Sequence, residues 1–372
     1  MKKLLFSTLF SLALTSVFAQ PTNAIRRGPP PMTLSPDIEA GRMVTFRLRA
    51  PRAQEVSVNG QWPNGRAAMS KDSNSVWSVT VGPVEPGVWE YSFQVDGLTM
   101  IDPGNSMIKP MRLPVTSILQ IRGEPPLLWD FQDVPHGTVH EHTYFSKSLG
   151  RMRAFDVYTP PNYEHEPDKK FPVLYLQHGS GDNQMTWTVH GKANWILDNL
   201  IAQGRAEPMI IVMMDGHAVR PGMGTNGPPL DQNTKLFERD LLEDVMPFAE
   251  QEYRVKGGAA NRAIVGLSMG GGQSLTIGLN HPDLFAWIGG FSSAAPSDDA
   301  IASALNDPAI NQKLKLLWVG DGKDDFLRKR NEDFIATLKA HNIQYQWHLS
   351  EGGHTWPVWR NYLIELTPKL FR

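Results

Sequence analysis

The sequence predicts two folded parts, an all-β sandwich followed by an α/β domain built on a mostly parallel sheet. Three observations support this division. Apolar residues alternate with a period of two up to about residue 122, a short segment containing Pro125 and Pro126 follows, and from residue 134 continuous apolar runs alternate with helical patterns. The length of 372 residues suits about two domains, each able to bury a core.

The overall charge and the cysteine count exclude several classes of protein. Lys and Arg total 36 against 38 Asp and Glu, so the net charge is -2, which gives no electrostatic signature of a nucleic-acid or anionic-membrane partner. Cysteine is absent, which excludes disulfides, thiolate metal sites and a cysteine nucleophile. We expect no metal and no organic cofactor, and the sequence does not indicate an oligomeric state.

The N-terminus has the pattern of a secretory signal peptide. Lys2 and Lys3 precede an apolar run from Leu4 to Val17, and small residues lie near Ala19. The run is short for a membrane anchor, which is the alternative. We therefore expect cleavage after about residue 19, a disordered lead-in over residues 20–30, a secreted or periplasmic protein, and no membrane association after cleavage.

The first folded part is expected over residues 31–122. Alternating strands are predicted at Val44–Leu48, Val76–Val81 and Trp89–Val95, and the last of these is followed by Asp96-Gly97, a strong signal for a tight hairpin turn. Short strands at about ten-residue spacing are typical of a β-sandwich. Residues 123–133 then form the predicted linker.

The second part, residues 134–372, begins with a hairpin-like pair at residues 138–145 and 151–158. Buried strands are predicted at residues 171–176, 209–214, 262–267, 287–291 and 315–319, and helices at residues 195–203, 236–253 and 270–279. Apolar strands that alternate with helices indicate a parallel sheet covered on both faces.

A G-x-S-x-G motif lies between the strand 262–267 and the small-residue helix that follows it. In Gly266-Leu267-Ser268-Met269-Gly270, a sharp strand-to-helix turn would lift the Ser268 hydroxyl above the sheet edge. The helix N-terminus would also direct free N–H groups toward developing negative charge. We therefore predict that Ser268 is a nucleophile; the alternative is a glycine-rich turn with an N-capping serine.

A serine nucleophile needs a histidine base, and in this architecture the base comes last in the chain. His354 lies in a glycine-rich loop after the last strand, Gly352-Gly353-His354, where the base belongs. His281 lies in a helix-ending turn, and His341 and His348 flank an edge strand, so these three are expected to be structural or exposed.

The histidine in turn needs an orienting carboxylate after the strand 315–319. Asp321, Asp324 and Asp325 are the candidates, and the spacing favours Asp325. Asp325 also precedes Phe326-Leu327, an apolar pair that can bury it against His354. The other two aspartates are then expected to be solvated loop charges.

An oxyanion hole needs two backbone N–H groups. Met269, the residue after the nucleophile, should supply one. The other should come from the glycine-containing loop Gln177–Asp182, where Ser180 is favoured and Gly179 and Gly181 are alternatives.

Residues 134–372 resemble the esterase D-like group of α/β-hydrolases, in particular the feruloyl and acetyl-xylan esterases of carbohydrate esterase family one. Several motifs carry the resemblance in one order, namely residues 178–181, 198–201, 237–242, 262–264, 266–271, 322–327 and 354–359. In that family the acid is the Asp before the Phe-Leu pair, which supports Asp325. Siderophore esterases of the enterochelin type share the pattern, so the resemblance implies the chemistry better than the substrate.

The N-terminal part resembles the early-set, immunoglobulin-like modules of carbohydrate-binding module family 48. The resemblance is carried by Phe46, Ala50-Pro51, Trp77, Tyr91–Phe93, Val95–Gly97 and Asp102–Asn105. It implies a companion module, which either binds sugar or is purely structural. Trp62, in the loop Asn59–Gly65, is less easily buried than the strand aromatics and could stack on a sugar ring or lean over the active site.

Together these features predict a secreted serine esterase that releases ferulate or related hydroxycinnamates from arabinoxylan, so the expected partner is a polysaccharide ester. Trp187, Trp195 and Trp356 are candidates for an aromatic acyl pocket, with core packing as their alternative. Acetyl-xylan hydrolysis and siderophore hydrolysis are alternative activities, and a peptidase is a further one. A non-catalytic carbohydrate-binding protein is the alternative of another class.

Overall fold

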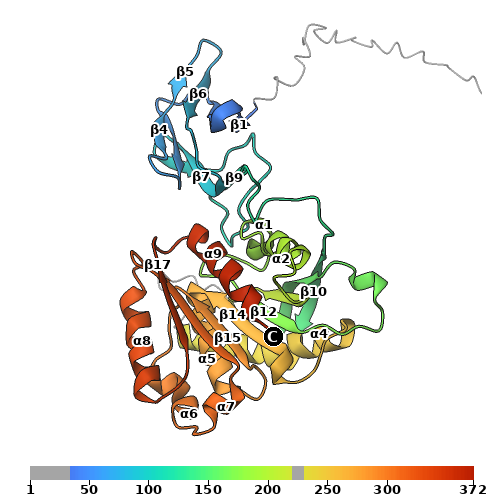
Figure 1. Ribbon diagram of the computed structural model, residues 1–372. Coiled ribbons are helices and arrows are strands. Elements are labelled where there is room, and N and C mark those ends of the chain that lie inside the picture. Colours follow the sequence, from blue (N-terminus) through green and yellow to red (C-terminus); the bar gives the residue numbers. More distant parts are fainter. Residues whose placement is uncertain (1–33, 220–229) are drawn as a thin grey trace, which may run out of the picture.

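The computed structural model describes residues 34–219 and 230–372, and shows an all-β part above a larger α/β part (Figure 1). The expected signal peptide, residues 1–19, and the lead-in, residues 20–30, lie outside the described residues. Within the described ranges, no helix has both the length and the apolar character needed to cross a bilayer.

The N-terminal part contains two antiparallel sheets. The first has the order β1-β2-β6-β5, and the second the order β4-β3-β7-β8, with β9 also paired to β7. Their bounds are β1 Asp37–Ile38, β2 Val44–Arg49, β3 Val56–Gly60, β4 Arg66–Ala68, β5 Ser70–Lys71, β6 Val76–Val81, β7 Gly87–Val95, β8 Leu98–Met100 and β9 Ser117–Ile121, with a short 3-10 helix at Ala40–Arg42. The described residues of this part thus form the all-β unit that the period of two predicts.

Aromatic side chains from both sheets form the core of this unit. Phe46 on β2 packs against Tyr91 and Phe93 on β7, with ring centroids 4.8 Å and 6.4 Å away. Trp62 also lies in this core, 5% exposed and stacked 5.8 Å from Phe46. The prediction that Trp62 lies exposed is therefore wrong: its loop folds the indole back over Gly60, whose missing side chain leaves the space that the ring fills.

The predicted hairpin turn joins β7 to β8. Asp96 and Gly97 have φ values of 48° and 84°. Positive φ at both central residues is the geometry of a type I′ turn, whose twist matches that of antiparallel strands, and Asn-Gly or Asp-Gly pairs adopt it most readily. The turn prediction is confirmed.

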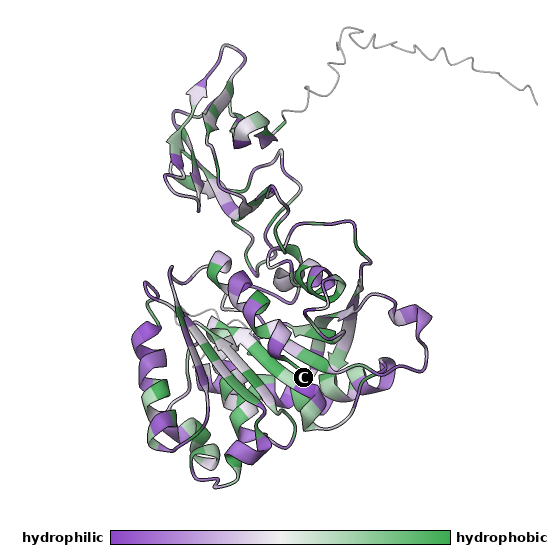
Figure 2. Cartoon of the chain, in the orientation of Figure 1, coloured by the Kyte–Doolittle hydropathy of each residue, from purple (hydrophilic) through white to green (hydrophobic). Residues whose placement is uncertain are grey.

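The second part is built on one eight-stranded sheet with the order β10-β11-β13-β12-β14-β15-β16-β17. The strands are β10 Thr138–Ser146, β11 Arg151–Thr159, β12 Val173–Gln177, β13 Ile210–Met214, β14 Arg262–Leu267, β15 Trp287–Phe291, β16 Leu316–Gly322 and β17 Gln346–Ser350. β10, β11 and β13 pair antiparallel, and from β13 to β17 every pairing is parallel. The inner parallel strands β12, β13, β14 and β15 are mainly apolar, because helices cover both faces of the sheet (Figure 2), whereas the edge strand β17 is mostly polar.

The helices divide between the two faces of the sheet. One core cluster includes residues of α3 (Leu230–Arg239), α4 (Met246–Glu252), α5 (Ser268–Asn280), α6 (Ala302–Leu305), α7 (Ile310–Lys313) and α8 (Arg328–Ala340). The other includes α1 (Thr186–Val189), α2 (Ala193–Ala202) and α9 (Trp356–Leu366). Short 3-10 turns lie at Tyr163–His165, Ala259–Asn261, Asp298–Ile301 and Thr367–Lys369.

Two elements differ from the sequence prediction in a way that affects the site. The single helix expected over residues 236–253 is divided by a π-helical segment, Asp240–Val245, between α3 and α4. Strand β16 extends to Gly322 and therefore includes Asp321, which was expected in a loop. Both differences place a carboxylate, Asp240 or Asp321, in a fully buried position.

Candidate active site

The predicted nucleophile lies on a strained turn between β14 and α5. Leu267 ends the strand in an extended conformation, and Ser268 begins the helix with φ of 52°, a value that non-glycine residues rarely adopt. A side chain at Gly270 would lie 2.3 Å from the backbone oxygen of His178, so the close packing of helix and sheet requires glycine there. The strain is of the kind that concentrates at functional sites.

His354 contacts the hydroxyl of Ser268. Its Nε2 lies 2.9 Å from Ser268 Oγ, a hydrogen-bond distance at which the ring can accept the hydroxyl proton. The residue lies in the loop between β17 and α9, and its side chain is 18% exposed. The structure thus brings together two residues that are 86 positions apart in the sequence, as the chain order predicts.

Asp325 holds the other nitrogen of that ring. His354 Nδ1 lies 2.9 Å from Asp325 Oδ2 and 3.1 Å from Oδ1. Burial would raise the pKa of this carboxyl, but hydrogen bonds from His354 and from the Leu327 N–H hold it below the ordinary value. Asp325 therefore stays ionised and fixes the tautomer with the proton on Nδ1, which leaves Nε2 free to accept.

The other acid candidates occupy different environments. Asp324 is exposed, as expected of a solvated charge. Asp321 is fully buried in β16, so the expectation that it is a solvated loop charge is wrong. Phe326 is 75% exposed, so it does not bury Asp325; its ring lies 4.5 Å from that of His354 instead.

The loop after β12 passes close to the nucleophile. A Cβ atom at Gly179 would lie 2.6 Å from Leu267 Cδ1 and 3.3 Å from the Cβ of Ser268, which shows how tightly the backbone approaches. Gly179 and Ser180 line the same cavity as Ser268. Met269 is the second residue of α5, so its N–H belongs to the first turn, whose amides lack an intrahelical acceptor. The predicted oxyanion donors therefore surround the nucleophile.

A second loop, the one after β13, holds this oxyanion loop by hydrogen bonds to histidine rings. His178 Nε2 accepts the N–H of Gly216 at 2.8 Å, so its proton lies on Nδ1, which donates to Gly179 O at 2.7 Å. The N–H of Gly181 donates to His217 Nε2 at 3.2 Å. Burial lowers the pKa of His217 to about 4, so the ring stays neutral and able to accept.

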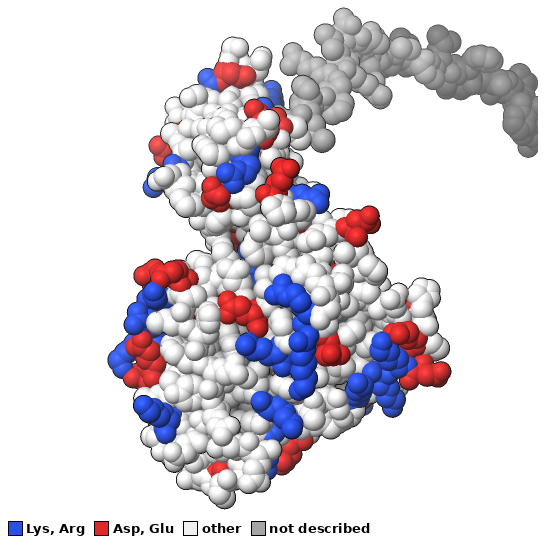
Figure 3. Space-filling model, in the orientation of Figure 1, with Lys and Arg blue, Asp and Glu red and all other residues white. Residues whose placement is uncertain are grey.

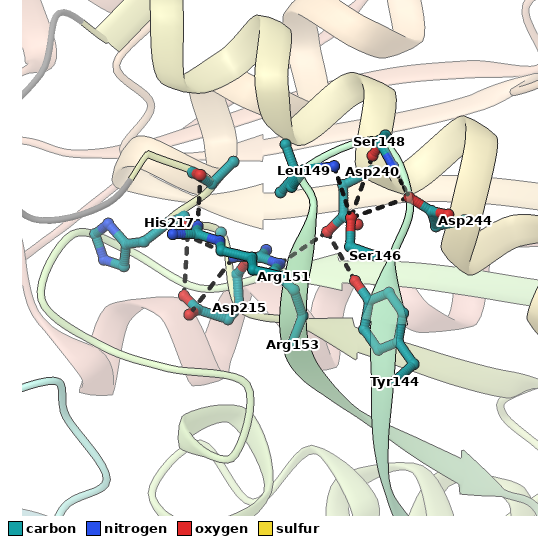
Figure 4. Close-up of polar contacts among 12 residues, drawn as sticks. Tyr144, Ser146, Ser148, Leu149, Arg151, Arg153, Asp215, His217, Asp240 and Asp244 are labelled. Carbon is teal, nitrogen blue, oxygen red and sulfur yellow. Dashed lines mark hydrogen bonds and ion pairs between the residues drawn. The ribbon is translucent and has the colours of Figure 1, made fainter.

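The loop after β13 is itself anchored by a buried charge cluster (Figure 4). Arg153 Nε lies 2.9 Å from Asp240 Oδ2, and the Tyr144 hydroxyl donates to the same oxygen at 2.7 Å. Arg153 also donates to the backbone oxygens of Asp215 and His217. The π-helical segment that contains Asp240 thus stabilises the loop that positions the oxyanion loop.

The nucleophile opens into a cavity of about 220 Å³. Ser268, His354, Trp356 and Trp359 line it from the α/β part, and Gln61, Glu90, Lys109 and Met111 line it from the N-terminal part. A second cavity, of about 470 Å³, lies beside it and is lined by Met269 and residues of α3 and α5. The sequence suggested only Trp62 as a residue of the N-terminal part near the active site. The four residues found there could not be predicted, because their place depends on how the two parts pack together.

The predictions that Trp356 and Trp187 line an aromatic pocket have different outcomes. Trp356 lies in the wall of the cavity, as expected for an aromatic pocket. Trp187 is fully buried behind it, 4.9 Å from the Trp356 ring, and its indole N–H donates to Gln177 O at 3.0 Å. The prediction that Trp187 lines the pocket is therefore wrong, and its alternative, core packing, holds: the residue supports the end of β12.

The charged side chains on one face, and the side chains able to bind a metal, are spread over the described residues. On the face in Figure 3, positive and negative side chains are interspersed over both parts. In residues 34–219 and 230–372, no three His, Asp or Glu side chains are grouped so that they could hold a metal ion.

The sheet order, the strained serine turn and the Ser268–His354–Asp325 geometry together define the class of α/β-hydrolase-like enzymes. The chain belongs to the Esterase family, whose model, described as "Putative esterase", matches residues 146–370. The matched part of the chain, residues 146–370, is a carboxylic ester hydrolase domain.

Two curated relatives are multifunctional or larger enzymes. An "Endo-1,4-beta-xylanase/feruloyl esterase" of Xylanibacter ruminicola is 32% identical over 345 residues, which cover 91% of this chain and 46% of the relative. "Endo-1,4-beta-xylanase Y" of Acetivibrio thermocellus is 26% identical over 63% of this chain and 23% of that protein. The chain thus spans less than half the length of these two relatives.

Solved structures share the fold. A ferulic acid esterase from Anaeromyces mucronatus, solved in complex with ferulic acid, is 25% identical with a TM-score of 0.58, over 65% of this chain and 93% of its own. The enterobactin esterase of Shigella flexneri is 18% identical with a TM-score of 0.62, over 88% of this chain and 92% of its own. The second likeness, at this identity, shows the fold alone.

Proposed function

We propose that this protein is a serine esterase that works through an acyl-enzyme, with Ser268 as nucleophile, His354 as base and Asp325 as the orienting acid. The observation that carries the proposal is the continuous hydrogen-bonded path from Ser268 Oγ to His354 Nε2, and from Nδ1 to Asp325, with each contact at 2.9 Å. A serine hydroxyl needs such a base to become nucleophilic at neutral pH.

In this mechanism His354 removes the proton of Ser268 as the oxygen attacks the ester carbonyl. The N–H groups of Met269 and Ser180, with Gly179 as the alternative to Ser180, stabilise the negative charge on the carbonyl oxygen. His354 then gives its proton to the departing alcohol, and the same residue activates the water that hydrolyses the acyl-enzyme. Neither step needs a metal or an organic cofactor.

The proposed substrate is a plant polysaccharide ester, in particular a feruloyl or related hydroxycinnamoyl ester of arabinoxylan. The printed activities of the xylanase/feruloyl esterase relative and of the ferulic acid esterase structure support this choice. So does the cavity, which exceeds what an acetyl group needs and has Trp356 and Trp359 in its wall. The exposed ring of Phe326 beside His354 adds an aromatic face at its edge.

The charge of the cavity argues against a highly anionic substrate. Lys109 is a cation in its wall, but it lies 3.0 Å from both Glu90 and Asp182 and is therefore neutralised. An iron-bound triscatecholate would require uncompensated positive charge, so siderophore hydrolysis is the weaker alternative. Acetyl-xylan hydrolysis remains the alternative that the test below separates.

For the N-terminal part we propose an immunoglobulin-like companion module similar to carbohydrate-binding modules. With Trp62 buried, any sugar binding must use other residues, so this role stays a prediction. Export through a cleaved signal peptide also stays a prediction, which rests on the sequence of residues 1–19.

The test measures products released from feruloylated arabinoxylan and from acetylated xylan side by side, with Ser268→Ala as the blank. Ferulate release that disappears in the variant supports the mechanism and the aromatic acyl group together. Acetate alone keeps the mechanism and rejects the aromatic substrate. Equal turnover of a simple ester by the variant and the wild type would reject the mechanism, as would failure of a fluorophosphonate probe to label Ser268, the result expected of a non-catalytic binding protein.

A further inference from the structure

The N-terminal part pairs directly with the loop that carries the proposed oxyanion donors. Met111 forms an antiparallel β-bridge with Asp182, and the N–H of Arg112 donates to Gly181 O at 2.9 Å. Next to Met111 in the same segment, Pro110 O accepts a hydrogen bond from the Thr186 hydroxyl at 2.7 Å. A short segment of the first part therefore acts as an added strand on the loop of the second.

A buried ion pair reinforces this backbone contact. Lys109 Nζ lies 3.0 Å from Asp182 Oδ1 and 3.0 Å from Glu90 Oε1. The side chains of Lys109, Glu90 and Asp182 are 8%, 7% and 5% exposed, so solvent screens their interaction little. Lys109 and Glu90 come from the N-terminal part, and Asp182 comes from the oxyanion loop.

Further contacts fix the position of the module around this pair. His190, fully buried, has its Nε2 3.4 Å from Glu90 Oε1. Arg360 on α9 is also buried and donates to Val88 O in β7 at 2.7 Å and to His190 O at 3.3 Å. The two parts are therefore joined by buried polar contacts, and a rigid joint can hold the loop with the accuracy that catalysis requires.

The geometry of the loop connects Lys109 to the nucleophile. The N–H of Asp182 donates to Gly179 O at 3.3 Å, so the residue that Lys109 holds closes the turn containing Gly179 and Ser180. Gly179 in turn lies against Ser268. A shift of Asp182 would therefore move the amides that face the reacting carbonyl.

We propose that the N-terminal module is a working part of the oxyanion hole, and that Lys109 is a positioning residue that holds Asp182, and through it the oxyanion loop, against Ser268. This inference rests on the proposed acyl-enzyme mechanism. It assigns the module a role in the chemical step for any ester, including one without a sugar.

The test uses the full chain and a small ester, para-nitrophenyl acetate. This ester is too small to contact a separate polysaccharide-binding site while it reacts at Ser268. Lys109→Met and Asp182→Asn are compared singly and together with the wild type. We expect each single variant to lower kcat by about 10- to 100-fold with little change in KM, because about 1 Å of misplacement can cost that much. The double variant should lose less than the product of the two single losses, since both remove one interaction.

A second readout measures the oxyanion hole directly. A phenylboronic acid forms a tetrahedral adduct on the serine, so its affinity should fall by the same factor as kcat in Lys109→Met and Asp182→Asn. Lys71→Met is the matched control: Lys71 lies on β5 of the same module, where it contacts Pro51 and Ala53, and the variant should keep wild-type kcat.

The outcomes separate this inference from the mechanism on which it rests. Unchanged kcat and boronate affinity in a folded Lys109→Met protein would overturn it, even if the melting temperature fell. If Lys109→Met does not fold, Asp182→Asn, which keeps the size and polarity of the side chain, decides by the same two readouts. If the wild type turns over the ester no faster than Ser268→Ala, the mechanism itself is wrong and the inference falls with it.

Discussion

The carboxyl groups of Asp321 and Asp325 adjoin each other at the end of β16, yet they differ in ionisation. Asp321 is fully buried, and burial, together with the negative charge of Asp325, raises its pKa to about 7. Asp325 has the hydrogen bonds of His354 and Leu327 to keep its pKa low. Below pH 7, therefore, one acid of the pair holds a proton while the other supports the histidine.

The raised pKa of Asp321 predicts that the free energy of unfolding decreases as pH rises. An unfolded Asp ionises near pH 4, whereas folded Asp321 keeps its proton to about pH 7. The folded state thus binds more protons across this window, so stability falls as pH rises from about 4 to 7. The variant Asp321→Asn removes that loss.

We therefore expect the melting temperature of Asp321→Asn, relative to the wild type, to increase steadily from pH 4 to pH 7 and then to stay level. Thermal melts followed by circular dichroism at several pH values would show this. Asp324→Asn, at an exposed position in the same loop, is the control and should show no such trend. Parallel curves for Asp321→Asn and the wild type would contradict the assignment.

An exposed aromatic ring beside the base predicts a binding effect without a stability effect. Phe326 is 75% exposed and lies 4.5 Å from the His354 ring. Phe326→Ala should raise KM for methyl ferulate by about 3- to 10-fold, equivalent to the contact energy of one aromatic pair, and leave the melting temperature unchanged. Phe145→Ala, 58% exposed on the far edge strand β10, should change neither quantity. A KM that stays at the wild-type value would show that substrate does not use this ring.

The buried cluster around Asp240 predicts a large loss of stability. Its Oδ2 accepts from both Arg153 and Tyr144, and the Arg153 side chain is only 3% exposed. Asp240→Asn removes the closer of the two carboxylates that pair with this guanidinium, since Asp215 lies 3.9 Å away, so the free energy of unfolding should fall by about 3 kcal/mol.

The neighbouring residue in the chain offers the control. Arg239 pairs with Glu243 on the surface, where both side chains are more than half exposed, and Arg239→Ala should cost at most about 1 kcal/mol. Urea unfolding followed by tryptophan fluorescence compares the two. Equal midpoints for Asp240→Asn and Arg239→Ala would show that the cluster does not anchor the structure.

Local signals were sufficient to predict the catalytic geometry. The strand-turn-helix pattern around Ser268 is a short-range feature, and the chain order led to His354. Spacing and the family resemblance favoured Asp325 among three aspartates, and the structure places it at hydrogen-bond distance from His354. The hydrophobic pattern likewise predicted the five parallel strands β12 to β16, because buried strands are apolar on both faces. It gave no range for the edge strand β17, which is mostly polar.

Features that depend on tertiary packing could not be predicted in this way. Trp62 was expected to be less easily buried than the strand aromatics because it lies in a loop, but the absence of a side chain at Gly60 makes room for the ring over the core. Lys109 and Glu90 carry no motif, and they reach the cavity only because the N-terminal module packs on the oxyanion loop. The buried state of Asp321 likewise follows from a longer β16.

The narrow space around Gly179 predicts a catalytic defect from a single methyl group. An alanine Cβ there would lie 2.6 Å from Leu267 Cδ1 and 3.3 Å from the Cβ of Ser268, so the Leu267 side chain or the loop must shift where the two meet at the nucleophile. Because the added methyl group would lie beside Ser268 on the loop that carries the proposed oxyanion donor, Gly179→Ala should lower kcat for para-nitrophenyl acetate by about 100-fold, in line with the loss of one such donor. KM should change little, since the ground-state ester depends less on this bond.

The matched control is Gly257→Ala, because a Cβ atom at Gly257 would meet nothing within 4 Å. This variant should keep the wild-type kcat and melting temperature. Steady-state kinetics on purified, folded proteins compares the two substitutions. Wild-type kcat in a folded Gly179→Ala protein would contradict this prediction, and the second oxyanion donor would then have to be sought outside this loop.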